Sequence, residues 1–203
     1  MKKIMMIAAM MVAVLSANAQ NEVGQVTLKP TVGMNIATMT KTNDSKVRVG
    51  MAAGVEAEYG VAEKFGISAG VLYSMQGVKS SENLLGADVD YIYKLDYINI
   101  PILAQYYIVP GLAIKAGIQP AFKASAKRTI KASADGTKAE RTDDLDDVKG
   151  FALSIPFGVS YEYKSFVLDA RYNLGVTKAF KESWESDSKN SWFMISLGYK
   201  FAL

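Results

Sequence analysis

Hydrophobic and polar residues alternate with a period of two along most of this chain of 203 residues. In the segment 151–163, odd positions carry Phe, Leu, Ile, Phe, Val, Tyr and Tyr, whereas even positions carry Ala, Ser, Pro, Gly, Ser and Glu. Successive side chains of a strand point to opposite faces, so this alternation predicts a β-strand with one apolar face. The pattern recurs to give eight predicted strands, at 26–37, 49–59, 67–76, 98–108, 114–125, 151–163, 166–177 and 192–203.

The connections between the predicted strands alternate between short and long. Short turns run through 61–65, 109–111 and 163–165, and longer polar loops cover about 39–48, 79–94, 128–149 and 178–191. In an antiparallel meander, every short turn would then lie at one end together with both termini, and every long loop at the other. An even number of strands in this layout is typical of outer-membrane barrels. The sequence therefore predicts an all-β fold, an eight-stranded antiparallel up-and-down transmembrane β-barrel.

The distribution of charge predicts which face of the barrel meets lipid. The apolar faces of the alternating segments carry no charged residue, whereas the polar faces carry nine. A basic side chain placed against hydrocarbon near the midplane costs about 2–4 kcal/mol, so the apolar face is expected to point outward. A soluble lipocalin-like barrel has the opposite arrangement and is disfavoured. The polar residues expected in the lumen are Lys29, Glu56, Glu58, Lys115, Lys123, Glu162, Asp169, Arg171 and Lys200.

A barrel of eight strands is narrow enough for side chains to fill its lumen. We therefore expect the lumen charges to form a hydrogen-bonded ion network that closes the bore, which disfavours a general diffusion pore. The carboxylates Glu56, Glu58, Glu162 and Asp169 could also be paired for acid–base catalysis. Their cationic neighbours favour the structural role.

Three further features of the predicted strands carry expectations. Four prolines inside them, Pro30, Pro101, Pro120 and Pro156, predict bulges or locally frayed pairing. Trp192 is expected to be an anchor at the membrane surface, in preference to a ligand platform. Aromatic residues near the short turns predict an interfacial girdle made of Tyr59, Phe65, Tyr106, Tyr107, Tyr161, Tyr163, Phe166 and Tyr199.

The N-terminus predicts an export signal. Two lysines at positions 2 and 3 precede an uncharged apolar segment at 4–15, and a small-x-small pattern ends at Ala19. As a helix, twelve residues span about 18 Å, too short for a hydrocarbon core of ~30 Å, which disfavours a membrane anchor. The predicted organisation is a signal peptide at 1–19 and an outer-membrane barrel domain at 20–203, exported by a Sec-type route and cleaved near Ala19.

The composition excludes several kinds of chemistry. With no Cys and no His, the chain has no disulfide, no thiol nucleophile, no thiolate metal site and no imidazole base. The balance of 23 basic against 20 acidic residues does not favour nucleic acid as a partner. We therefore expect no enzyme activity, no cofactor and no metal centre.

One acidic run is a candidate cation site. It extends from Asp143 to Asp147 and contains four Asp residues. Hard cations such as Ca²⁺ bind several oxygen ligands at short spacing, but this run lacks the Gly and distal Glu of a calcium loop. A solvated surface loop is the favoured interpretation, and a cation or lipopolysaccharide-bridging site the alternative. The loops 137–149 and 178–190 are the expected partner-contact regions.

Two motifs resemble a known family. Residues 97–103 read Tyr-Ile-Asn-Ile-Pro-Ile-Leu, which is similar to a Tyr-x-x-Ile-Pro-Leu-Leu motif in the Bacteroidetes outer-membrane β-barrel family of PorT-like and OmpA-like small barrels, also called porin family proteins. The C-terminus resembles the signal that the barrel assembly machinery recognises, through Ser196, Gly198, Phe201 and Leu203. Leu203 stands where Phe is commoner. The resemblance implies a small barrel of generally unassigned function with no active site to carry over, and some relatives assist protein secretion.

Taken together, the sequence leads to a main hypothesis and two alternatives. The main one is a non-enzymatic structural or interaction protein that presents four loops at the cell surface. The alternatives are an accessory of protein secretion or envelope assembly, and a solute-binding or conducting barrel. The expected partners are outer-membrane lipid and lipopolysaccharide, the barrel assembly machinery during biogenesis, and surface or envelope proteins.

Overall fold

The computed structural model describes residues 23–39, 45–84, 87–134, 137–145, 147–178 and 189–203. Within these ranges, no helix is long and apolar enough to cross a membrane. The predicted signal peptide lies outside the described residues. The strands are β1 (Val26–Met39), β2 (Ser45–Ala62), β3 (Phe65–Leu84), β4 (Ala87–Asn99), β5 (Ile102–Val109), β6 (Leu112–Ala134), β7 (Thr137–Asp144), β8 (Phe151–Tyr163), β9 (Phe166–Gly175), β10 (Asn190–Tyr199) and β11 (Phe201–Ala202).

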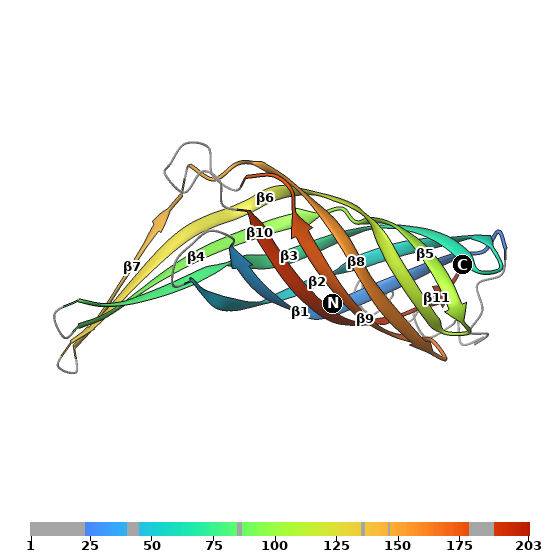
Figure 1. The fold of residues 1–203 in the computed structure, drawn as a ribbon, viewed down its shortest axis with the longest axis horizontal. Helices are drawn as coiled ribbons and strands as arrows, with labels where there is room; N and C mark the ends of the chain where they lie inside the picture. Colours follow the sequence, from blue (N-terminus) through green and yellow to red (C-terminus); the bar gives the residue numbers. More distant parts are fainter. Residues whose placement is uncertain (1–22, 40–44, 85–86, 135–136, 146, 179–188) are drawn as a thin grey trace, which may run out of the picture.

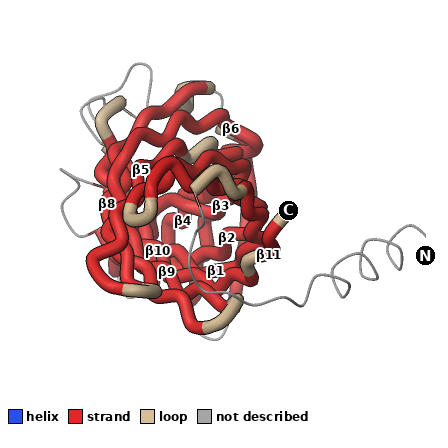
Figure 2. Tube along the Cα trace, turned by 90° about the vertical axis from the view of Figure 1, so that its right-hand side faces the viewer, coloured by secondary structure: helices blue, strands red, loops and turns tan. Residues whose placement is uncertain are grey.

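The strands close into an antiparallel barrel (Figures 1 and 2). Around the ring the order is β1, β2, β3, β4, β6, β8, β9 and β10, and β10 pairs with β1 to close it. The short strand β5 continues the path of β4 between β3 and β6, and β11 continues the path of β10 beside β1. The barrel therefore has eight antiparallel strand positions around its wall, because β5 shares a position with β4 and β11 shares one with β10. This confirms the predicted fold class.

The two ends of the barrel differ (Figure 1). At one end, here called the short-turn end, β2–β3, β5–β6 and β8–β9 join through two residues each. At the other, the hairpin end, β3 pairs with β4 as far as Leu84 and Ala87, and β6 pairs with β7 as far as Ala134 and Thr137. These hairpins extend beyond the barrel as a twisted ribbon.

The prediction of polar loops at 79–94 and 128–149 was therefore largely wrong. Most of these residues form the long hairpins, and β7 accounts for much of the segment 137–149. The period-two signal requires one apolar face. Both faces of the protruding ribbon carry polar residues, so the alternation is weaker there than in the barrel wall, although it persists at the odd positions of 89–95.

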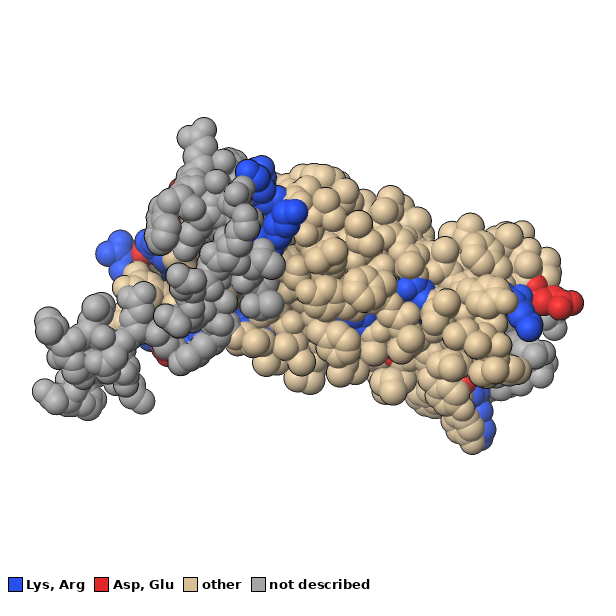
Figure 3. All heavy atoms as spheres, viewed as in Figure 1, with Lys and Arg blue, Asp and Glu red and all other residues tan. Residues whose placement is uncertain are grey.

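The outward face of the barrel wall is apolar. Met34, Leu168 and Ile195, from β1, β9 and β10, are each 44–56% exposed on it. Figure 3 shows few charged side chains over the middle of the visible face, and charges gathered toward the ends. One outward carboxylate occurs near the hairpin end, where the Tyr73 hydroxyl donates a hydrogen bond of 2.9 Å to Asp96. This arrangement suits hydrocarbon on the outside, because many large apolar side chains of the wall are exposed.

Pro101 and Pro156 coincide with interruptions in strand pairing, as predicted. Pro101 lies in the gap between β4 and β5. Between β6 and β8, the ladder pairs Ala116 with Phe157 and resumes at Gln119 with Ser154, so Pro156 lies in an unpaired step. A proline has no N–H to donate, so a local loss of ladder hydrogen bonds is expected at these positions.

Candidate functional site in the lumen

The centre of the lumen is crossed by a cluster of ion pairs, here called the central cluster. Arg171 on β9 places Nη2 2.7 Å from Glu56 Oε1 on β2, and its Nε donates to Asp169 Oδ1 at 2.5 Å. Lys29 Nζ lies 2.6 Å from Glu56 Oε2, and Lys115 Nζ lies 2.8 Å from Asp169 Oδ2. All five side chains are at most 6% exposed. The cluster therefore connects β1, β2, β6 and β9 through the interior.

A second group of ion pairs, the lower cluster, lies toward the short-turn end. Lys200 Nζ donates to Glu162 Oε2 at 2.7 Å and lies 3.2 Å from Glu58 Oε2. The Tyr107 hydroxyl donates to Glu58 Oε1 at 2.6 Å and accepts from Lys200 at 3.2 Å. Tyr107 was predicted to be part of the outer girdle, which is wrong. Its hydroxyl has polar partners only inside, and a buried hydroxyl without a partner is costly.

The two clusters balance in charge. Four cations, Lys29, Lys115, Arg171 and Lys200, face four carboxylates, Glu56, Glu58, Glu162 and Asp169. A buried ion is tolerated when it is paired and hydrogen-bonded, and each of these eight has at least one such partner. The sequence identified all eight by strand parity, since each lies on the polar face of its strand.

Small residues make room for these long side chains. A Cβ added at Gly198 would lie 2.8 Å from Lys29 Cγ, and one added at Gly70 would lie 2.7 Å from Glu56 Cγ. Both contacts are closer than real Cβ atoms show. Glycine at these positions therefore lets a lysine and a glutamate pack flat against the neighbouring strand.

Lys123 is the one predicted lumen charge that the structure places outside both clusters. Its Nζ donates to the backbone carbonyl of Val148 at 3.2 Å, and its backbone N–H donates to Gly150 at 2.8 Å. Among the described residues, no carboxylate forms a salt bridge with it. Its expected place in the ion network is therefore not found, because it lies nearer the hairpin end than the paired charges.

The lumen near the hairpin end is apolar, which the sequence did not predict. Val148 is fully buried there and packs with Val78, Leu95, Tyr97, Ala121 and Ala126, a set here called the outer apolar cluster. Val148 belongs to a short polar segment between β7 and β8. A single apolar residue in a polar stretch carries no periodicity, so no sequence signal marked it.

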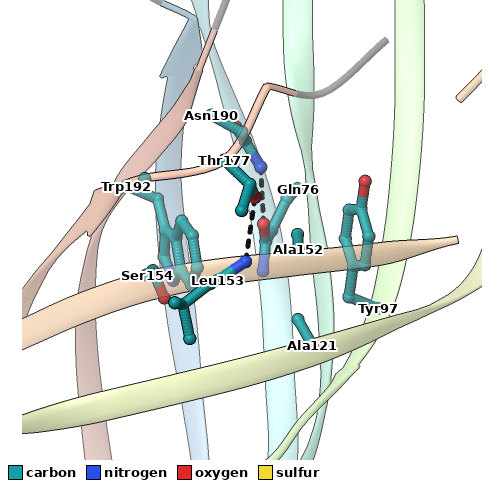
Figure 4. A pocket seen from close by; sticks show the side chains of 10 residues that line it. Gln76, Tyr97, Ala121, Ala152, Leu153, Ser154, Thr177, Asn190 and Trp192 are labelled. Carbon is teal, nitrogen blue, oxygen red and sulfur yellow. Dashed lines mark hydrogen bonds between the residues drawn. The ribbon is translucent and has the colours of Figure 1, made fainter. Parts of the chain in front are cut away.

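A small pocket lies beside this cluster (Figure 4). Tyr97 and Trp192 lie on its opposite sides, and its free space is ≈ 20 Å³, about the room that one water molecule needs. Asn190 donates to Gln76 at its rim, at 2.5 Å. Trp192 is 4% exposed and faces the lumen, so the prediction of a surface anchor was wrong. Its parity on β10 matches that of Ser196 and Gly198, and this was the available signal.

Comparison with protein-family models adds the decisive observation. Residues 18–181 match the model described as "Outer membrane protein beta-barrel domain". The match covers well over half of the chain. The chain belongs to the outer membrane protein beta-barrel domain family. It is an outer-membrane protein. In outer-membrane barrels the short turns generally lie on the periplasmic side and the long connections on the extracellular side.

Several solved structures resemble this member of the family. Ail, the attachment invasion locus protein of Yersinia pestis, has 16% identity and a TM-score of 0.46, over 89% of this chain and 100% of that chain. Neisserial surface protein A has 14% identity and a TM-score of 0.46, over 92% and 98%. OprG from Pseudomonas aeruginosa has 14% identity and a TM-score of 0.39, over 90% and 98%. No curated protein matches. No functional statement follows from similarity at this level.

The described residues of the acidic run lie at the hairpin end of the barrel. Asp143 in β7 pairs with Arg141 at 2.9 Å and with Arg128 at 3.9 Å. Among the described residues, no group of Asp and Glu is arranged to hold a metal ion, and Asp146 lies outside them. Asp143 thus has basic partners from its own hairpin, and the alternative of a cation or lipopolysaccharide-bridging site stays a prediction.

The residues of the predicted assembly signal lie in β10, in β11 and at the C-terminal residue that follows β11. Ser196 and Gly198 face the lumen, and Ser196 is 3% exposed. The Phe201 ring lies tilted against Tyr199 with ring centroids 4.6 Å apart, and Tyr199 meets Phe166 edge-on at 5.1 Å. These rings lie at the short-turn end, where an aromatic girdle was predicted. Recognition by an assembly machinery stays a prediction.

Proposed function

We propose that this protein is a non-enzymatic outer-membrane barrel with a sealed lumen, which anchors extracellular hairpins for contact with partners. The observation that carries the proposal is the pair of ion-pair clusters across the lumen, with eight paired charges between them. A water-filled pore needs an open polar path, whereas these side chains are directed at one another and are at most 8% exposed. The lumen then acts as a rigid support and not as a passage.

The protruding hairpins provide the contact surface in this proposal. Their charged side chains pair within the ribbon, as in Lys79 with Asp90 at 3.0 Å and Lys131 with Glu140 at 3.2 Å. Such cross-strand pairs stabilise an ordered, water-exposed ribbon relative to an irregular loop. A polar, ordered projection suits a partner with a polar surface, and the sugars and phosphates of lipopolysaccharide or an envelope protein have one.

A second function is supported by the motif at 97–103, which resembles that of PorT-like barrels of Bacteroidetes. Some members of that group assist protein secretion or envelope assembly. This alternative retains the sealed barrel and differs in the partner, which would be a component of a secretion or assembly apparatus. Under this alternative, deletion of the gene would impair secretion. If the protein had a purely structural role at the surface, no such defect would be expected.

In-cell photo-crosslinking tests the proposed contact surface. A photoreactive amino acid replaces Glu140, which is exposed on β7, and in a matched variant it replaces Lys164, which is exposed in the β8–β9 turn. Reproducible adducts at position 140 that are absent at 164 support extracellular partners. Adducts only at position 164 would move the contact to the periplasmic side and favour the assembly role. If no adducts form at position 140 and none form at position 164, the result would contradict a partner-contact function.

A further inference from the structure

Toward the hairpin end of the lumen, Lys123 has no carboxylate partner among the described residues. It lies on β6 between Ala121 and Ala126 of the outer apolar cluster, in register with Tyr97 on β4. Its ammonium donates to one neutral oxygen, the Val148 carbonyl at 3.2 Å. The eight charges of the two clusters balance four against four among themselves, and Lys123 belongs to neither cluster. An ammonium in a partly enclosed site is better stabilised by a carboxylate than by a neutral carbonyl.

Val148 presents two chemical groups to this place at once. Its side chain fills apolar space against Tyr97 and Ala121, and its carbonyl oxygen accepts from the Lys123 ammonium. A small apolar carboxylate would offer the same two groups, because its hydrocarbon would fill the apolar space and its carboxylate oxygen would accept from the Lys123 ammonium. The pocket of ≈ 20 Å³ beside it extends the apolar space toward Trp192 (Figure 4).

The described residues of the segment that carries Val148 make a small set of contacts. The Val148 and Leu145 side chains pack in the outer apolar cluster, the Val148 and Gly150 carbonyls accept from Lys123, and the Leu145 N–H donates to Ala126 at 3.0 Å. A Cβ added at Gly150 would meet nothing within 4 Å, so the end of the segment is open to solvent. A ligand with a stronger bond to Lys123 can therefore compete with it.

We propose that the outer end of the lumen is a binding site for a small apolar carboxylate, and that Val148 occupies this site when the ligand is absent. Lys123 binds the carboxylate, and the outer apolar cluster with the Tyr97–Trp192 pocket receives the hydrocarbon. The central cluster closes the lumen below, so the ligand binds from the extracellular side and does not pass through. The site goes beyond the proposed contact function and does not depend on it.

Trp192 supplies a local signal for the test. The chain has two tryptophans, so Trp184→Phe leaves Trp192 as the sole one, in the wall of the site. The folded barrel in detergent is titrated with 4-methylpentanoate and, separately, with the neutral 4-methylpentanamide. The proposal predicts a saturable change in Trp192 fluorescence with the acid and at least a tenfold weaker response to the amide. Equal titration curves would overturn it, because they would show partition of the apolar group alone.

Two variants and one control assign the site. Lys123→Gln should weaken binding of the acid by about tenfold to a hundredfold, the usual worth of a hydrogen bond to a charged group. Lys127→Gln, an exposed lysine on the same strand, should leave binding unchanged. Val148→Ala removes apolar atoms from the competing segment and should tighten binding by about tenfold. Heat-modifiable migration on a gel checks that each variant is folded.

The outcomes separate clearly. Unchanged affinity in the folded Lys123→Gln variant, or no saturable binding in either the parent chain or Val148→Ala, would overturn the proposal. A parallel titration with N-acetylglycylvaline distinguishes two sources of the same chemistry. Tighter binding of this dipeptide than of 4-methylpentanoate would identify the C-terminus of a peptide as the ligand, and the reverse would identify a free carboxylic acid.

Discussion

The guanidinium of Arg171 on β9 lies 2.7 Å from the carboxylate of Glu56 on β2, across the lumen. These two residues are 115 positions apart in the chain, and β10 and β1 separate their strands around the ring. The pair therefore braces the barrel from inside, in addition to the ladders that run around its wall. Lys29 and Asp169 extend the brace to both sides.

Removing the carboxylate of Glu56 should destabilise the barrel strongly. Glu56→Gln leaves Arg171 and Lys29 buried with less compensation, and breaking a buried pair in this way costs about 3–5 kcal/mol. The free energy of unfolding, measured by urea titration in lipid vesicles, checks the value. Glu140→Gln, in the exposed pair with Lys131, is the matched control and should change it by less than about 1 kcal/mol. Equal effects of the two variants would contradict the brace.

A charge on the outer wall should be costly only where the wall meets hydrocarbon. Ile195 is 44% exposed near the middle of β10, and Ile195→Lys should lower the free energy of unfolding by about 2–4 kcal/mol. Tyr163, 63% exposed beside the β8–β9 turn, lies at the interface, where Tyr163→Lys should cost about 0–1 kcal/mol. Vesicle-based unfolding measures both. A larger cost at position 163 would contradict the outward orientation of the apolar face.

Gly198 should be intolerant of even one methyl group. Gly198→Ala would press against Lys29 Cγ and shift the Lys29–Glu56 pair, with a cost of about 1–3 kcal/mol. Gly150→Ala, where a Cβ meets nothing within 4 Å, should be neutral or slightly stabilising. Comparison of the two urea midpoints tests this directly, and an equal shift in both variants would argue against a packing role for Gly198. Because Gly198 is also part of the predicted assembly signal, the measurement uses chains refolded in vitro.

Strand parity in the sequence was sufficient for much of this structure. The lumen positions of Glu56, Asp169 and Arg171 follow from alternation alone, because each strand within the membrane has lipid on one side and polar side chains on the other. The closed barrel of eight antiparallel strand positions was predicted from the alternation of short turns and long connections. Local interruption at Pro101 and Pro156 followed from the missing N–H of proline.

What the sequence did not predict lies where the two faces of a strand have the same polarity. The hairpins β3–β4 and β6–β7 have water on both faces, and the outer apolar cluster is apolar on the inside as well. Trp192 and Tyr107 were assigned by residue type, and not by the parity that places them in the lumen. The burial of Val148 depends on a tertiary contact with β4 and β6, which no local pattern records.

Single-channel recording in a planar lipid bilayer tests the central claim, that paired charges seal the lumen. The purified barrel should insert without stable open-channel steps across the usual range of voltage and salt. Glu56→Gln, if it folds, should introduce brief openings because it loosens the central cluster. Stable, ohmic conductance in the unmodified protein would contradict the account.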